Sequence, residues 1–159
     1  MKFFVLTALL LLLILPLHST PLYAQESEIE VFLSNFNYDL RDEMKSNSKE
    51  LMQLLLRGEG ILVDIRFPEE VAAWHMGFGL TIPLNELPRR LAELPKDKII
   101  IAACPHKDRS AIAMAYLRSK GYDAKYLEDG LIGLEELLRG ERAKDFMTEL
   151  ANIKSNKKP

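Results

Sequence analysis

Short apolar runs in the middle of the chain predict buried strands, and the clearest one covers Lys98–Ala103. After its lysine this run is continuously apolar, as expected for a central strand of a parallel sheet that is covered on both faces. Ile61–Ile65 is a second run with β-branched residues, and its short length and the preceding glycine favour a strand over a helix. Leu80–Ile82 and Ala124–Leu127 are predicted as two further short strands.

Between and after these strands, apolar residues recur at helical spacing. The predicted helices cover residues 48–57, 109–120, 131–138 and 143–153. Gly58 is expected to end the first helix, and Gly121 takes the position after the end of the second. In the second helix, Ile112, Ala115 and Tyr116 fall on one face, which is the periodicity that predicts it.

Strands that alternate with helices predict an α/β fold with a mainly parallel central sheet, flanked by helices on both faces. Ligands of such sheets bind beyond the carboxyl ends of the strands. Cys104 stands at such an end, directly after the predicted central strand and before a helix. This placement makes it a candidate functional residue.

Composition is that of an ordinary soluble globular protein, with 48% hydrophobic and 28% charged residues. A length of 159 residues suggests one domain with appendages. The net charge is −2 and basic residues are mixed with acidic ones, so we expect no nucleic-acid partner, which would need a basic face.

Residues 1–24 differ from the rest of the chain. They begin with the positive Lys2, continue as an almost wholly apolar stretch over residues 3–17, and end with Ala24 before the expected cut at Gln25. This pattern is typical of a secretory signal peptide, although an uncleaved N-terminal anchor is the alternative. The apolar stretch is shorter than the ~20 residues of a membrane-spanning helix, so no stable span is expected after signal removal. Export indicates the bacterial periplasm, or the cell surface in an organism with one membrane.

The rest of the chain divides into three predicted parts. Residues 25–47 form an N-terminal extension with some helix, in which Phe32, Leu33, Phe36 and Leu40 are possible anchors. Residues 48–140 form the domain. Residues 141–159 form a C-terminal helix and a loose polar tail.

The segment from Cys104 to Ser110 carries the candidate chemistry. Cys104 is the single cysteine of the chain, so it has no partner for an internal disulfide. Unpaired N–H groups and the dipole at a helix start attract anions, and a thiolate held there is expected to have a lowered pKa. His106, Lys107 and Arg109 add positive charge, and Arg109 is able to bind an oxyanion through two parallel hydrogen bonds.

A strand, then a cysteine, then an arginine at the start of the next helix admits two classes of enzyme, the cysteine phosphatases and the rhodanese family. The loop alone does not separate the two classes, because Cys104, Arg109 and Ser110 satisfy both motifs, although phosphatases of this fold are expected to have a longer spacing that leaves room for a tetrahedral dianion. The flanking segments therefore have to decide.

Four flanking segments resemble rhodanese domains. They are the strand with its Asp-x-Arg end, the Glu…His segment, the Ile-Pro-Leu-x-Glu-Leu segment and the closing Gly-Tyr…Gly stretch, at Ile61–Arg66, Glu69–His75, Ile82–Leu87 and Gly121–Gly130. The resemblance covers about residues 48–140 and implies a rhodanese-like fold.

The resemblance also implies a sulfurtransferase reaction. Cys104 would attack a small anionic sulfane sulfur donor such as thiosulfate, hold the sulfur as a persulfide and pass it to cyanide or a thiol. The family implies no nucleotide, metal or flavin cofactor. Residues expected to bind the substrate are Arg109, Lys107, His106 and Ser110, and residues expected to organise the neighbouring loops are Asp64 and Arg66.

The loop departs from the family pattern. Pro105 follows the cysteine where the family often has arginine, and Lys107 and Asp108 stand where a glycine is common. Glu69 and Glu70 are interpreted as solvated surface rather than catalytic carboxylates, since adjacent helix residues do not face each other. The unusual loop keeps open a non-catalytic or redox-sensing binding module as the alternative function.

Overall fold

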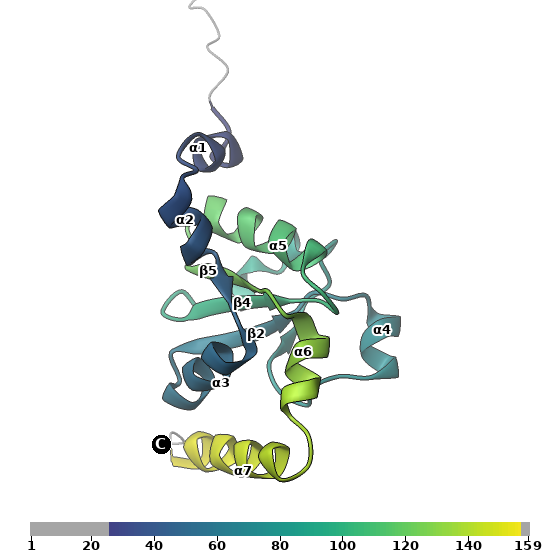
Figure 1. The fold of residues 1–159 in the computed structure, drawn as a ribbon. Helices are drawn as coiled ribbons and strands as arrows, with labels where there is room; N and C mark the ends of the chain where they lie inside the picture. Colours follow the sequence, from purple (N-terminus) through teal and green to yellow (C-terminus); the bar gives the residue numbers. More distant parts are fainter. Residues whose placement is uncertain (1–25, 157–159) are drawn as a thin grey trace, which may run out of the picture.

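Five parallel strands form one sheet in the computed structural model, which describes residues 26–156 (Figure 1). The strand order is β1-β5-β4-β2-β3. Their bounds are β1 Lys45–Ser46, β2 Gly60–Asp64, β3 Leu80–Thr81, β4 Ile99–Ala103 and β5 Ala124–Leu127. The prediction of an α/β fold with a mainly parallel sheet is confirmed.

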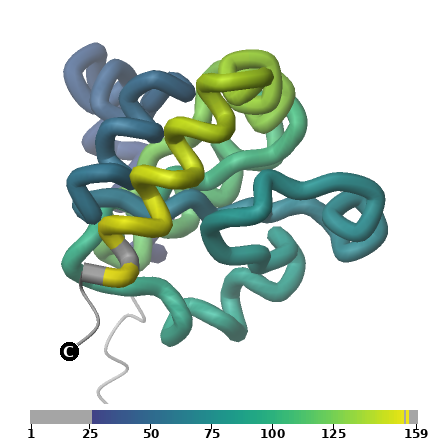
Figure 2. Tube along the Cα trace, turned by 90° about the horizontal axis from the view of Figure 1, so that it is seen from below, coloured from purple at the N-terminus to yellow at the C-terminus, as the bar shows by residue number. Residues whose placement is uncertain are grey.

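Helices cover both faces of the sheet, as predicted (Figures 1 and 2). One face carries α1 Glu28–Ser34, α2 Tyr38–Glu43 and α5 Asp108–Ser119. The other carries α3 Ser48–Arg57, α6 Gly130–Leu137 and α7 Glu141–Asn156. The short α4 Pro68–Ala73 follows β2, and two 3-10 turns, η1 Leu87–Arg89 and η2 Leu91–Glu93, precede β4.

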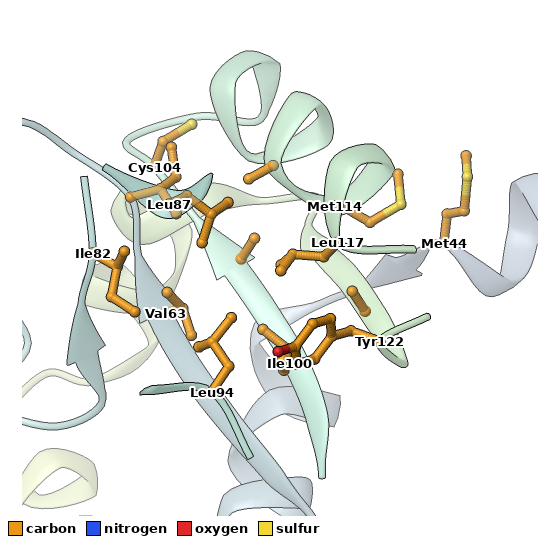
Figure 3. Close-up of a cluster of buried hydrophobic side chains, with 14 residues drawn as sticks. Met44, Val63, Ile82, Leu87, Leu94, Ile100, Cys104, Met114, Leu117 and Tyr122 are labelled. Atoms are coloured by element: carbon orange, nitrogen blue, oxygen red, sulfur yellow. The ribbon is translucent and has the colours of Figure 1, made fainter. Parts of the chain in front are cut away.

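Two buried clusters hold these layers together. The first lies between the sheet and α5, and Figure 3 shows Cys104 at one end of it, near Leu87, with Tyr122 at the other end. The second joins α3, α6 and α7 to the opposite face of the sheet through residues such as Leu51, Leu134 and Phe146. Apolar burial on both faces explains why β4 reads as a continuous apolar run.

The central strands β2 and β4 are paired along their whole length, from Gly60 with Ile99 to Asp64 with Ala103. Their carboxyl ends therefore lie side by side. This register brings the segment after β2 next to Cys104, although the two are distant in the sequence.

The face of α5 that packs on the sheet is not the face that predicted the helix. Ile112 is 61% exposed, whereas Ala113, Met114 and Leu117 are buried. Apolar residues occupy both stripes of this helix, so periodicity indicates a helix but does not determine its orientation. The predicted bounds of the helices differ from the observed ones by three residues at most.

The parts predicted as appendages contribute to the domain. The end of the N-terminal extension supplies the edge strand β1, which pairs with β5 at Lys45 and Tyr126. Of its expected anchors, Phe32 and Leu40 pack on the first cluster, while Leu33 and Phe36 are exposed.

At the other end, Phe146 and Leu150 of α7 are part of the second cluster, and the helix runs to Asn156, three residues into the predicted tail. The predicted signal peptide, residues 1–24, and the last tail residues, 157–159, lie outside the described residues. Within residues 26–156, no helix is long and apolar enough to cross a membrane.

The orientation of α5 is testable by stability measurements. Leu117→Ala should lower the free energy of unfolding by about 2–5 kcal/mol, because it removes fully buried atoms. Ile112→Ala, at a side chain that is 61% exposed, should change it by about 0.5 kcal/mol or less. Denaturant unfolding of the two variants compares them directly, and equal losses would contradict the observed orientation.

Candidate active site

Cys104 lies immediately after β4, at the carboxyl end of the central strand, and is buried with 0% exposure. Its Sγ lies 3.7 Å from Ser110 Oγ and 3.8 Å from Asp108 Oδ1. The loop from Cys104 to Lys107 then leads into α5. The buried sulfur thus lies at the edge of the sheet where ligands of parallel sheets bind.

The amino end of α6 fixes the outer side of this loop. The N–H of Leu131 donates to the carbonyl of Cys104 at 2.8 Å, and the N–H of Ile132 donates to that of Pro105 at 3.3 Å. Gly130 has φ +65°, and a Cβ there would lie 2.3 Å from the carbonyl oxygens of Pro105 and His106. Only glycine permits this approach, which explains the glycine of the closing motif.

The backbone N–H groups of the loop and of the first turn of α5 are available to a ligand. None of those at residues 106–110 donates to an acceptor in the described part of the chain, and the first helical bond of α5 is from Ala111 to Lys107. The carbonyl of Pro105 points to α6, so the trans peptide directs the His106 N–H the other way. Together with the helix dipole, these groups suit an anion.

Ser110 stabilises the loop through its side chain. Its side chain is fully buried, and its Oγ donates to the carbonyl of Lys107 at 3.0 Å. Lys107 has φ −145°, and no described residue other than glycine has a positive φ. The loop therefore closes without the glycine that is common in the family.

Arg109 points from α5 to α4, where Glu70 binds it. Nη1 donates to Oε2 at 2.6 Å and Nη2 to Oε1 at 2.8 Å, which is a bidentate pair. The guanidinium also lies 5.8 Å from the centre of the Phe67 ring. Hydrogen bonds from Arg109 lower the pKa of Glu70 to about 2, and Glu70 in turn raises the pKa of Arg109.

Asp64 and Arg66 form a buried ion pair beside the loop. Arg66 is fully buried, and its Nε and Nη2 donate to the two carboxylate oxygens of Asp64 at 2.9 and 2.6 Å. Its Nη2 also donates to the carbonyl of Trp74 at 2.9 Å, and the Trp74 ring stacks on the guanidinium at 4.1 Å. The pair thus connects the end of β2 to the segment after α4.

The remaining predicted site residues face solvent. The side chains of His106 and Lys107 are exposed and form no hydrogen bond or ion pair with the described residues. The structure therefore brings Cys104 and Ser110 together inside the loop, whereas Arg109 is bound to Glu70 of α4. No three histidine, cysteine, aspartate or glutamate side chains within residues 26–156 are grouped so that they could hold a metal ion.

A model of the rhodanese-like domain matches residues 47–136, more than half of the chain. The chain belongs to the rhodanese-like domain family. It is 39% identical over 77 residues to a sulfurtransferase of Allochromatium vinosum, a match that covers 48% of this chain and 72% of that one. It is also 38% identical over 85 residues to an HTH-type transcriptional regulator of Mycobacterium tuberculosis, of which the match covers 38%.

Solved structures agree with this assignment. A rhodanese-like domain protein of Staphylococcus aureus is 30% identical with a TM-score of 0.53, over 57% of this chain and 89% of that one. A rhodanese-related protein of Thermoplasma volcanium is 26% identical with the same TM-score, over 58% and 90% of the two chains. The family and the sulfurtransferase relative support a sulfurtransferase-type role.

Three residues of this rhodanese domain were not recognised as site residues from the sequence. Glu70 is bound to Arg109 and is not simply solvated, Asp108 lies near the sulfur, and Gly130 allows α6 to reach the loop. A signal for Glu70 exists in the fold rule that neighbouring parallel strands end at one edge, which places the residues after β2 near those after β4. The sequence does not show which of the two adjacent glutamates, Glu69 or Glu70, binds Arg109.

The Glu70–Arg109 pair predicts a pH dependence of stability. The pKa of Glu70 is lower in the folded protein, about 2, than its ordinary value of 4.5. Its contribution is therefore complete above pH 4.5 and is lost as the pH falls towards 2. Glu70→Gln should cost at most about 1 kcal/mol at neutral pH, since the pair is partly exposed, and less near pH 3. Urea unfolding at both pH values measures this, and an equal cost at both would contradict it.

Proposed function

We propose that this rhodanese domain transfers a sulfane sulfur from a donor to a thiophilic acceptor through a persulfide on Cys104. The observation that carries the proposal is the position of the only cysteine, at the end of the central strand and inside a loop with five unpartnered N–H groups among the described residues. The similarity to a sulfurtransferase supports the same reaction class.

The proposed reaction has two displacements at sulfur. The Cys104 thiolate attacks the sulfane sulfur of the donor, forms a new S–S bond, and the old bond breaks to release the remainder of the donor with its electron pair. Cyanide or a thiolate then attacks the outer sulfur of the persulfide, leaves as thiocyanate or a new persulfide, and regenerates the Cys104 thiolate. The loop N–H groups would stabilise the negative charge on the outer sulfur.

The other site residues have proposed roles that follow from their contacts. Ser110 supports the loop and lies within reach of the sulfur. His106 and Lys107, exposed at the rim, would guide anionic reactants by long-range attraction. Asp64 and Arg66 would hold the segment that carries Glu70.

A binding or redox-sensing module is the second candidate, and the burial of Cys104 favours it. A sulfur with 0% exposure is accessible only to a reactant that enters the loop. The two candidates differ in whether Cys104 accepts sulfur. For either, we propose export through residues 1–24, with the periplasm as the site of action.

Loading of Cys104 tests the proposed function. Purified reduced protein should gain the mass of one sulfur atom after treatment with thiosulfate or glutathione persulfide, and cyanide should remove it. Cys104→Ser should gain no mass, because it lacks the nucleophile. Its free energy of unfolding should stay within about 1 kcal/mol of that of the unchanged protein.

Intact-mass spectrometry of both proteins gives the result. A mass gain in Cys104→Ser would overturn the assignment of the nucleophile. No gain in the unchanged protein with either donor would favour the binding module.

A further inference from the structure

The two outer nitrogens of Arg109 are already bound to a carboxylate. Nη1 and Nη2, the nitrogens that hold an oxyanion in a bidentate pair, both donate to Glu70, at 2.6 and 2.8 Å. The side chains are 26% and 34% exposed, so the pair is partly removed from water. An oxyanionic donor that uses this face of Arg109 must therefore displace Glu70.

Glu70 is held in place by more than Arg109. Its Oε2 accepts the N–H of Phe67 at 3.3 Å, and its carbonyl accepts Nη1 of the buried Arg66 at 3.5 Å. With a pKa of about 2, its carboxyl group is ionised at any physiological pH. Glu70 therefore keeps its charge and its position beside the loop.

A second carboxylate, that of Asp108, lies close to the sulfur of Cys104. Asp108 Oδ1 lies 3.8 Å from Cys104 Sγ, at the first residue of α5. Coulomb repulsion is proportional to charge, so a dianion at this place is repelled twice as strongly as a monoanion. An uncharged group is not repelled.

We propose that Glu70 is the specificity-determining residue of this site, and that by occupying Arg109 it selects persulfides of thiols over small oxyanionic donors such as thiosulfate. The inference rests on the proposed persulfide chemistry of Cys104. It names the donor class for that reaction. In this protein the loop arginine is a positioning residue that ties α5 to α4, and is not a receptor for the donor.

The selected reaction balances without any further reactant. The Cys104 thiolate attacks the outer sulfur of R–S–SH and forms a new S–S bond, the S–S bond of the donor breaks, and R–S⁻ leaves with its electron pair and takes a proton from water. The same attack on thiosulfate would expel sulfite as a dianion past Asp108 and Glu70. The departing sulfur of the thiolate carries a single charge, and further charges of R lie several bonds away, so it meets less repulsion on its way out.

The direct test compares the rates at which two donors load Cys104. Second-order rate constants for thiosulfate and glutathione persulfide, whose charges lie several bonds from its sulfur, are measured by intact mass for the unchanged protein and Glu70→Gln. We expect the unchanged protein to prefer the persulfide, and Glu70→Gln to raise the thiosulfate-to-persulfide ratio by about tenfold. Glu69→Gln is the matched control, because it removes the same charge from an exposed neighbour in α4 that has no contact with Arg109.

Sulfate gives a readout that does not depend on sulfur transfer. As an unreactive dianion it should slow iodoacetamide alkylation of Cys104 at lower concentration in Glu70→Gln than in the unchanged protein or Glu69→Gln. Asp108→Asn serves as a second variant with the same expected direction, should Glu70→Gln fold poorly.

Two results would overturn the inference: a preference of the unchanged protein for thiosulfate, or equal ratios and equal sulfate protection in Glu70→Gln and Glu69→Gln. Failure of every protein to load from either donor would instead overturn the proposed function. The sulfate measurement would then still decide whether Glu70 excludes dianions.

Discussion

The site depends on the contact between the amino end of α6 and the loop after β4. Two N–H groups of α6 take the carbonyl oxygens of Cys104 and Pro105, and Gly130 allows the two backbones to come close enough. Because the carbonyl of Pro105 faces α6, the N–H of His106 in the same trans peptide points the other way, whereas Pro105 itself has no N–H. The loop thus leaves the N–H groups of residues 106–110 without partners among the described residues, even though proline and lysine replace residues common in the family.

A second set of contacts lies beside that loop. The buried Asp64–Arg66 pair holds the segment after β2, this segment carries Glu70, and Glu70 holds Arg109. Removing one member of a buried pair leaves an uncompensated charge, so loss of Asp64 or Arg66 is expected to disturb the segment that carries Glu70. On the proposed account, the unpartnered N–H groups favour negative charge at the sulfur, whereas the carboxylates of Glu70 and Asp108 disfavour small dianions there. Under the proposed function, this combination would favour a persulfide over an oxyanionic donor.

Most of the fold was accessible from the sequence, because apolar runs such as Ile99–Ala103 read alike in any parallel sheet. The position of Cys104 followed from the same reasoning. The orientation of α5 did not, since both of its stripes are apolar, and the edge strand β1 is too short to give a pattern. The Glu70–Arg109 pair joins residues 39 positions apart through side-chain geometry, which periodicity and spacing do not encode.

The most direct measurement of the central claim is a crystal structure of the protein after its cysteine has been loaded with sulfane sulfur. The outer sulfur is expected inside the loop, within hydrogen-bonding distance of backbone N–H groups from residues 106–110, with Arg109 still bound to Glu70. An outer sulfur that points away from these groups, or that is held by an Arg109 released from Glu70, would contradict the account.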